Sequence, residues 1–296
     1  MDNKKSNLIS PGFLQKLETL QLMSKKIIRG SIKGERSSAK RGRSVEFADY
    51  RNYVPGDEIR IIDWNIYGRL DKLFIKLFVE EEELVLYILI DNSLSMDFGN
   101  PKKIHVSRQI AAAISYIALS NFDRVAFGII GKSLAHYQAP IRGKSQIFKI
   151  FDLLESIKPS GETSLGVAIR EFASRKLRPG MVIIISDFLD EGDFCQSIKY
   201  LAFQKHDIFL IQVLDAFELN PDLGGDLKLV DIETGDYKDV TVTDKLLDMY
   251  KDAVSGHCRD IKDFSHSIGS GYILAPTSIP FEDLVMEYFR HGKLFM

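Results

Sequence analysis

The stretch that decides the fold is LVLYILIDNSLS, residues 84–95. Its seven apolar residues (84–90) run without interruption and end at Asp91, and Ser93 and Ser95 follow at alternate positions. A continuous apolar run of this length is typical of a strand that is buried on both faces of a sheet. It places a carboxylate and two hydroxyls at the end of that strand, which is where α/β sheets bind their ligands.

The same kind of strand recurs along the chain and alternates with helical patterns. Further strands are expected at 124–130, 181–186, 207–213 and 271–274, with a hairpin over 227–243 that turns at Thr234-Gly235. Asn100 and Pro101 predict the start of a helix that runs to about residue 120. Other helices are expected near 145–156, 164–176, 192–204, 244–267 and 281–290. This alternation predicts an α/β fold with a mostly parallel sheet and helices on both faces.

The segment before this alternating region is expected to form an N-terminal extension, which divides the chain into residues 1–81 and 82–296. Apolar residues recur every three or four positions over 11–29, as in an amphipathic helix. A basic stretch (25–43) follows, and its glycines and serines indicate a loop in its second half. Residues 72–80 read as one more strand.

Composition excludes several classes of protein. The 296 residues are 45% hydrophobic and 27% charged, with a formal net charge of −2, so no overall charge draws the chain to nucleic acid. The basic stretch lacks the interleaved aromatics that favour single-strand binding, and we expect it to be a solvated surface. No apolar run approaches the length of a membrane span. The two cysteines, Cys195 and Cys258, form no close pair, as is usual in a reducing compartment. Together, the missing membrane span and the unpaired cysteines predict a cytoplasmic protein.

Two further segments place oxygen ligands near Asp91. Asp187 directly follows the strand MVIIIS (181–186), and Thr163 lies in the loop PSGETSLGVAI (159–169) just before a helical pattern. If the two strands are neighbours, Asp91 and Asp187 point into one crevice. Asp91, Ser93, Ser95, Thr163 and Asp187 then offer only oxygen atoms, which is the ligand set that Mg²⁺ prefers, with Mn²⁺ as the other candidate.

This arrangement resembles the metal-ion-dependent adhesion site of von Willebrand factor A domains, whose fold is Rossmann-like. The resemblance rests on Asp-x-Ser-x-Ser after a buried strand, a later threonine and a later strand-end aspartate. It implies a non-catalytic protein-binding domain whose metal takes an acidic side chain from a partner. Two positions depart from the usual pattern: Glu162 stands before Thr163, and Phe188 follows Asp187, where the family often has glycine.

A second resemblance covers almost the whole chain. The block GRSVEFADYRNYVPGDEIRIIDWNIYGRLDKLFIKLFVEE (42–82) is similar to the signature of the bacterial family called domain of unknown function fifty-eight. Positions that match are Glu46-Phe47, Tyr50-Arg51, Pro55-Gly56-Asp57, Arg60 and Asp63-Trp64. The resemblance implies an A-type domain after this block and an association with MoxR-type AAA+ ATPases. The expected function is therefore a Mg²⁺-dependent adaptor for such an ATPase.

The signature block itself allows two interpretations. Its arginines, aspartates and tyrosines form either an internal hydrogen-bonded network or a docking surface, and the network is the favoured one. Its aromatics, Phe47, Tyr50, Tyr53 and Trp64, are expected to be buried, because large aromatic side chains usually are.

Other functions are weighed against the adaptor. A metal-dependent hydrolase that uses the same oxygen cluster and a metal-activated water is the main alternative, and a purely structural scaffold is a third. A phosphatase with an aspartate nucleophile normally needs a second aspartate two residues on, where this chain has Ser93. The sequence GKS at 143–145 lacks the first glycine of a phosphate-binding loop, since position 138 is Gln138.

Overall fold

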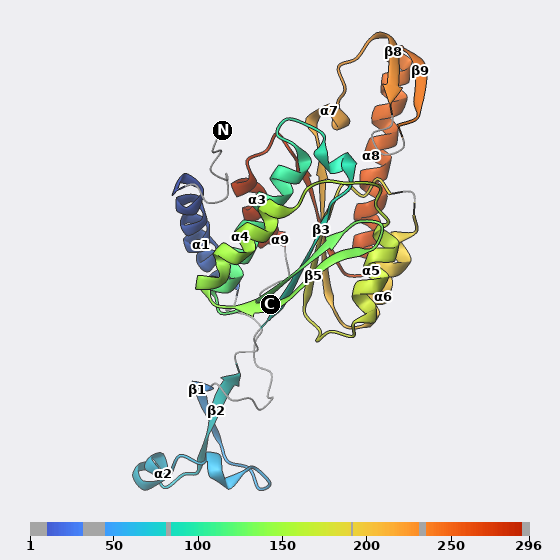
Figure 1. The fold of residues 1–296 in the computed structure, drawn as a ribbon. Coiled ribbons are helices and arrows are strands. Elements are labelled where there is room, and N and C mark those ends of the chain that lie inside the picture. The colour runs from blue at the N-terminus through green and yellow to red at the C-terminus, as the bar shows by residue number, and fades with distance from the viewer. Residues whose placement is uncertain (1–10, 32–44, 81–83, 191, 231–234, 292–296) are drawn as a thin grey trace. The chain divides into compact units, whose positions relative to one another are not determined.

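A computed structural model describes residues 11–31, 45–80, 84–190, 192–230 and 235–291. The chain forms two compact units (Figure 1). The larger unit contains the helix at 11–31 together with the residues from 84 onward, and the smaller unit lies within residues 32–83.

The larger unit is built on one six-stranded sheet. Its strands are β3 (Val85–Asp91), β4 (Arg124–Ile130), β5 (Leu134–Arg142), β6 (Met181–Ser186), β7 (Asp207–Leu214) and β10 (Gly271–Pro276). They lie in the order β10-β7-β6-β3-β4-β5, and all neighbours are parallel except β4 and β5. The predicted α/β class and mostly parallel sheet are confirmed. The antiparallel edge strand β5 was not predicted, because its polar residues and Pro140 obscure the strand pattern.

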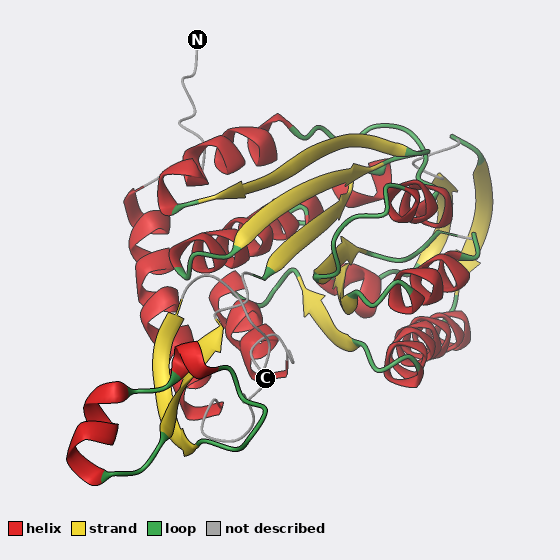
Figure 2. Ribbon diagram, turned by 90° about the horizontal axis from the view of Figure 1, so that it is seen from below, coloured by secondary structure: helices red, strands yellow, loops and turns green. Residues whose placement is uncertain are grey.

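Helices cover both faces of this sheet, as predicted (Figures 1 and 2). One face carries α1 (Pro11–Ser31), α3 (Lys103–Ser120), α4 (Ile147–Ser156) and α9 (Phe281–His291). The other carries α5 (Leu165–Ser174), α6 (Phe194–Phe203) and α8 (Asp244–Ser267). Within the described ranges, no helix is both long enough and apolar enough to cross a bilayer.

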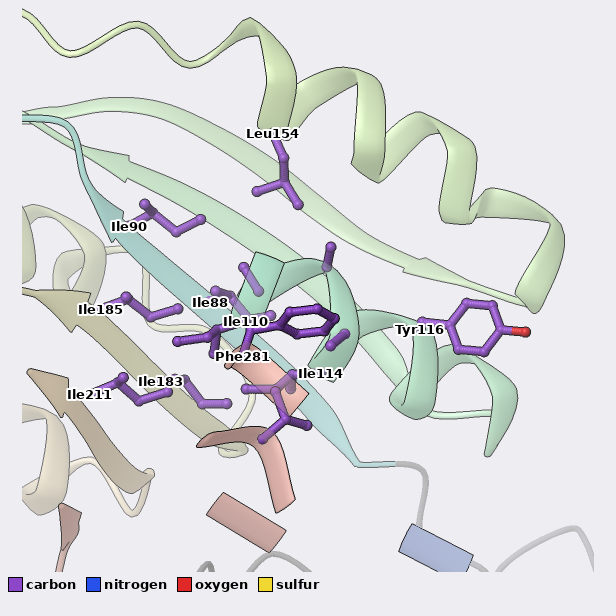
Figure 3. Close-up of a cluster of buried hydrophobic side chains, with 14 of the residues drawn as sticks. Ile88, Ile90, Ile110, Ile114, Tyr116, Leu154, Ile183, Ile185, Ile211 and Phe281 are labelled. Carbon is purple, nitrogen blue, oxygen red and sulfur yellow. The ribbon is translucent and has the colours of Figure 1, made fainter. Parts of the chain in front are cut away.

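The position of β3 inside the sheet explains why its sequence is apolar throughout. Leu86, Ile88 and Ile90 pack into the hydrophobic cluster beneath α3, and Figure 3 shows Ile88 and Ile90 on the strand with Ile88 near Ile110 of that helix. Val85, Tyr87 and Leu89 pack into the opposite cluster with α5 and α6. Side chains alternate between the faces of a strand, so a strand covered on both faces needs apolar residues at every position.

Helix α1 belongs to this larger core. Phe13, Leu17 and Leu20 are buried in the cluster under α3, and the Phe13 ring lies 5.1 Å from the ring of Phe281. The sequence interpretation had grouped this helix with the signature block, whereas the structure packs it on the α/β unit. The predicted boundary at residues 81–82 falls beside 81–83, outside the described residues, and stays a prediction.

The packing of α1 leads to a stability prediction. Leu17→Ala should lower the free energy of unfolding by about 2–5 kcal/mol, the usual cost of deleting a fully buried leucine side chain. Gln15→Ala, on the exposed side of the same helix, is the matched control and should change it little. Urea denaturation of the full chain measures both values. Equal stabilities for the two variants would show that α1 is not part of the core.

Two smaller features refine the sequence predictions. Helix α3 begins at Lys103, and Lys102 is its N-cap, so the predicted start at Asn100 and Pro101 was wrong. The Lys103 N–H donates to the Phe98 carbonyl, so residues 98–103 form a turn that precedes the helix. The predicted hairpin is confirmed as β8 (Gly225–Val230) and β9 (Tyr237–Val242), while Thr234 of its turn lies outside the described residues.

The smaller unit is a hairpin with two short helices. Strand β1 (Val45–Asn52) pairs antiparallel with β2 (Phe74–Glu80), and η2 (Ile59–Ile61) and α2 (Trp64–Leu70) lie between them. Asp63 caps α2 through the Asn65 and Ile66 N–H groups and accepts a hydrogen bond from the Tyr50 hydroxyl at 3.1 Å. Arg51 pairs with Asp57 at 2.9 Å. These contacts support the internal-network interpretation within this unit.

The predicted burial of the signature aromatics was wrong for Trp64 and Tyr50, which are exposed, and Tyr53 is only half-buried. The Trp64 side chain is 58% exposed, because it begins α2, a seven-residue helix in which no residue is buried. Its ring meets only the edge of Tyr67 among the described ring contacts. The side chain of Phe47 and residues 32–43 of the basic stretch lie outside the described residues.

Candidate metal site

Two carboxylates lie at adjacent strand ends. Strands β3 and β6 are parallel neighbours, with Ile90 paired to Ile185, so Asp91 and Asp187 leave the sheet side by side at its carboxyl edge. Each of the two residues is only 2% exposed. The condition on which the sequence prediction depended, that these two strands are neighbours, is therefore met.

Hydroxyl groups connect the two carboxylates. The Thr163 hydroxyl donates to Asp91 Oδ1 at 2.9 Å, and the Ser93 N–H donates to the same oxygen at 2.9 Å. The Ser93 and Ser95 hydroxyl oxygens are 2.8 Å apart, and Ser95 donates to Asp187 Oδ2 at 2.8 Å. The structure thus brings all five predicted residues into one hydrogen-bonded cluster.

Backbone hydrogen bonds hold the Thr163 loop against the loop after β3. The Leu94 N–H donates to the Gly161 carbonyl at 3.1 Å, and the Ser160 N–H donates to the Asn92 carbonyl at 2.9 Å. Gly161 has a φ of +67°, a conformation that favours glycine. Glu162, the first departure from the adhesion-site pattern, is exposed and pairs with Lys132 at 3.0 Å. Its charge therefore sits at the surface beside the cluster.

The second departure, Phe188, occupies a backbone position suited to glycine. Its φ is +57°, in the left-handed region that few non-glycine residues adopt. The Phe188 N–H donates to the Ser186 hydroxyl, and its ring is fully buried next to Phe194. Burial of a large aromatic side chain offsets the backbone strain, so the departure changes the packing beneath the site and removes no oxygen ligand.

Three residues that the sequence prediction missed complete the cluster. Ser186 donates to Asp91 Oδ2 at 2.5 Å. Lys103 is fully buried, and its Nζ lies 2.8 Å from Asp187 Oδ2 and 2.6 Å from Glu218 Oε1. In the structure Lys103 is the first residue of α3, where the helix dipole disfavours a cation. The two carboxylates offset this unfavourable position, and no local sequence pattern indicated them.

Glu218 is fixed in place by a capping box on the short helix α7 (Ala216–Leu219). Its Oε2 accepts from the Asp215 N–H at 2.7 Å, while the Asp215 side chain caps the helix through the Phe217 N–H. Asp215 also accepts from the Thr277 hydroxyl at 2.6 Å. The polar cluster therefore extends from the end of β3 to the end of β10.

Burial and neighbouring charges shift the pKa values of Asp91 and Lys103. Burial, and then the charge of Asp187, raise the pKa of Asp91 to about 6, although hydrogen bonds from Ser186, Ser93 and Thr163 oppose the rise. Burial works to lower the pKa of Lys103, but Asp187 and Glu218 outweigh it and raise that pKa. Lys103 is therefore a permanent ammonium, whereas the charge on Asp91 is poorly compensated.

The donor set fits one hard divalent cation. Two carboxylates and three hydroxyls converge, and oxygen donors of this kind suit Mg²⁺. The raised pKa of Asp91 indicates a carboxylate that lacks a nearby positive charge. No group of three or more histidine, cysteine, aspartate or glutamate side chains able to hold a metal occurs among the described residues. A cation here would depend on the hydroxyls as well as the two aspartates.

A comparison with known protein families places the chain. The family described as "Protein of unknown function DUF58" matches residues 49–259, from the signature block to the middle of α8. The chain belongs to this family. Membership in the DUF58 family agrees with the sequence resemblance over residues 42–82 and extends it through all five predicted site residues.

Relatives and similar folds are known. An uncharacterized protein of Mycobacterium tuberculosis is 27% identical over 264 residues, which span 87% of this chain and 82% of the relative. Among solved structures, the conserved hypothetical protein BatB from Bacteroides thetaiotaomicron gives a TM-score of 0.42 at 17% identity, covering 69% of this chain and 96% of BatB. A von Willebrand factor type A protein from Catenulispora acidiphila gives 0.38 at 13% identity, covering 74% and 43%.

Gly99 provides a test of the packing around Asp215. Its φ is +95°, and an added Cβ would fall against the Asp215 carboxylate. Gly143 has a similar φ of +93° but faces open space, so it is the matched control for backbone strain. We expect Gly99→Ala to lower the free energy of unfolding by about 1–3 kcal/mol more than Gly143→Ala, the usual cost of overpacking. Chemical denaturation measures both values. Equal losses of unfolding free energy in the two variants would show that the Asp215 side chain moves aside without cost.

Proposed function

We propose that this chain is a non-catalytic, Mg²⁺-dependent protein-binding module. The observation that carries the proposal is the cluster of Asp91, Asp187 and three hydroxyls at the carboxyl edge of the sheet. The buried Asp91 carboxylate lacks a compensating charge, and a divalent cation would supply it. The resemblance to adhesion sites adds the expectation that a partner's acidic side chain completes the coordination of the metal.

The surroundings of the cluster support a protein as the partner. Leu189 and Phe217 follow the ends of β6 and β7, and Phe98 follows η3 (Leu94–Asp97) near the end of β3. All three side chains are exposed, and the Phe98 and Phe217 rings lie 6.3 Å apart. Apolar side chains around a polar centre are typical of protein-binding surfaces. A flanking apolar residue of the partner would add affinity to the metal contact.

The resemblance also supplies the proposed partner. We propose that the module acts as an adaptor for a MoxR-type AAA+ ATPase, carrying a client protein to it or regulating it. The main alternative is a hydrolase that uses the same site. Turnover of p-nitrophenyl phosphate or a generic peptide with Mg²⁺ or Mn²⁺, lost in Asp91→Asn, would establish the hydrolase and overturn the adaptor.

The adaptor proposal is tested with the MoxR-type ATPase of the same organism. Binding of wild type and Asp91→Asn is titrated at one fixed Mg²⁺ concentration, because the ATPase itself needs Mg²⁺ and a chelator would disable both proteins. We expect wild type to bind and the variant to lose most of its affinity. Failure of wild type to bind contradicts the adaptor role, and equal binding of the two shows that the ATPase does not use this site.

A further inference from the structure

The site contains a cation of its own. Lys103 is fully buried, and its ammonium lies between Asp187 and Glu218 at 2.8 and 2.6 Å. Removing an ammonium from water is costly unless carboxylates and good geometry compensate for it. The position is also unfavourable for a cation because it begins helix α3. A lysine that only filled space here would cost more stability than a methionine.

The ammonium is held firmly on one side of the cluster. Glu218 uses its second oxygen to accept from the Asp215 N–H. The Glu218 side chain therefore cannot move away with the Lys103 ammonium without breaking the cap of α7. Asp187 Oδ1 accepts from the Leu189 N–H at 3.1 Å, which fixes the other carboxylate. Asp91, at the end of the neighbouring strand β3, forms its hydrogen bonds with hydroxyls and a backbone N–H.

The net charge of the cluster indicates a role for the Lys103 ammonium. Asp91, Asp187 and Glu218 together with Lys103 leave two net negative charges when all are ionised, so a bound divalent cation makes the cluster neutral. Without the ammonium, the loaded cluster would keep one net negative charge. An anionic ligand would then be repelled, while the metal itself would be held more tightly.

We propose that Lys103 sets the charge that a bound divalent cation presents to an anionic ligand. It lowers the affinity of the site for the cation and raises the affinity of the loaded site for a carboxylate. This inference rests on the proposed cation site. Lys103 is a positioning residue in it, because it acts on the ligand through the net charge of the loaded site. Opposite changes in the two affinities are its signature, because loss of folding would weaken both.

Three variants form a charge series. Lys103→Met removes the ammonium, Glu218→Gln removes one carboxylate, and the double variant restores the net charge of wild type. We expect Mn²⁺ affinity to rise at least about tenfold in Lys103→Met, to fall by a similar factor in Glu218→Gln, and to return toward wild type in the double variant. Lys102→Met is the matched control, since that neighbouring ammonium is largely exposed and pairs with Asp97 at the surface.

The probes are Mn²⁺ and acetate. Free Mn²⁺ is quantified by electron paramagnetic resonance, and binding of ¹³C-acetate to the loaded site is measured from broadening of its carboxylate signal by Mn²⁺. Acetate affinity should follow the reverse order: highest in Glu218→Gln and lowest in Lys103→Met. Thermal melting confirms that each variant is folded, and Glu218→Gln keeps the test decisive if Lys103→Met is unstable.

The outcomes separate the inference from the proposed function. If wild type binds no Mn²⁺, the cation site fails and the inference fails with it. If wild type binds Mn²⁺ but both affinities change in the same direction across the series, or the double variant does not recover, Lys103 is a structural ion pair and only the inference is overturned. Opposite changes with recovery in the double variant support it.

Discussion

Asp91→Asn should weaken Mg²⁺ binding by at least about 100-fold, since loss of residues that only support a metal ligand already costs 10–100-fold. The asparagine keeps the shape of the side chain and one oxygen to accept from Ser93 and Thr163. Without metal, the variant should be more stable than wild type at pH 7, by up to about 3 kcal/mol, because it no longer buries a charge beside Asp187. Calorimetric Mg²⁺ titration and chemical denaturation measure the two effects.

Asp97→Asn is the matched control for this prediction. Asp97 lies in the same loop but faces the surface, where it pairs with Lys102 at 2.7 Å. Its replacement should leave Mg²⁺ affinity close to that of wild type. If both variants lost the same affinity, Mg²⁺ would be responding to the general negative charge of the loop. If neither lost any, the cation would bind elsewhere.

The contribution of Asp91 to the stability of the metal-free protein should fall as pH rises from about 4 to above 6. The pKa of Asp91 is raised to about 6 by burial and by Asp187, so the folded state holds this proton more tightly than the unfolded chain, whose pKa is near 3.8. The resulting stabilisation is complete below the unfolded pKa and is lost as pH passes through the folded pKa. A rise of the Asp91 pKa from 3.8 to about 6 corresponds to a change of about 3 kcal/mol in the free energy of unfolding.

The same proton competes with the cation. Mg²⁺ affinity should therefore rise about tenfold between pH 5 and pH 7, because binding needs the ionised carboxylate. Other groups also titrate in this range, so the informative quantity is the difference between wild type and Asp91→Asn in the free energy of unfolding. A difference that stays constant from pH 4 to pH 8 would show that folding does not raise the pKa of Asp91, which contradicts the expected rise.

Much of the larger unit was predictable because its signals are local. Buried parallel strands require continuous apolar runs, and the carboxyl ends of neighbouring strands meet at one edge. Asp91 and Asp187 could therefore be expected to meet if their strands were neighbours, and the strand order of the sheet supplied that condition. Thr163 followed from its position in a glycine-containing loop before a helix. The hydrogen bonds among these residues agree with that placement.

The features that were missed depend on contacts between distant segments. Lys103 and Glu218 are 115 residues apart, and their pairing follows from the order of β3, β6 and β7 in the sheet. The packing of α1 against α3 and α9 likewise has no local signal, since an amphipathic pattern does not say which surface it covers. The burial predicted for Trp64 failed because aromatic residues tend to be buried only on average.

The most direct test of the account is a crystal of the full chain grown with Mn²⁺ and measured at the manganese absorption edge. We expect one anomalous peak per chain, in contact with the Asp91 carboxylate and the hydroxyls of the Ser93 and Ser95 loop, with Lys103 still paired to Glu218. The peak should be absent from crystals of Asp91→Asn. No peak at millimolar Mn²⁺, or a peak held by other residues, would contradict the claim that this strand edge is a divalent-cation site.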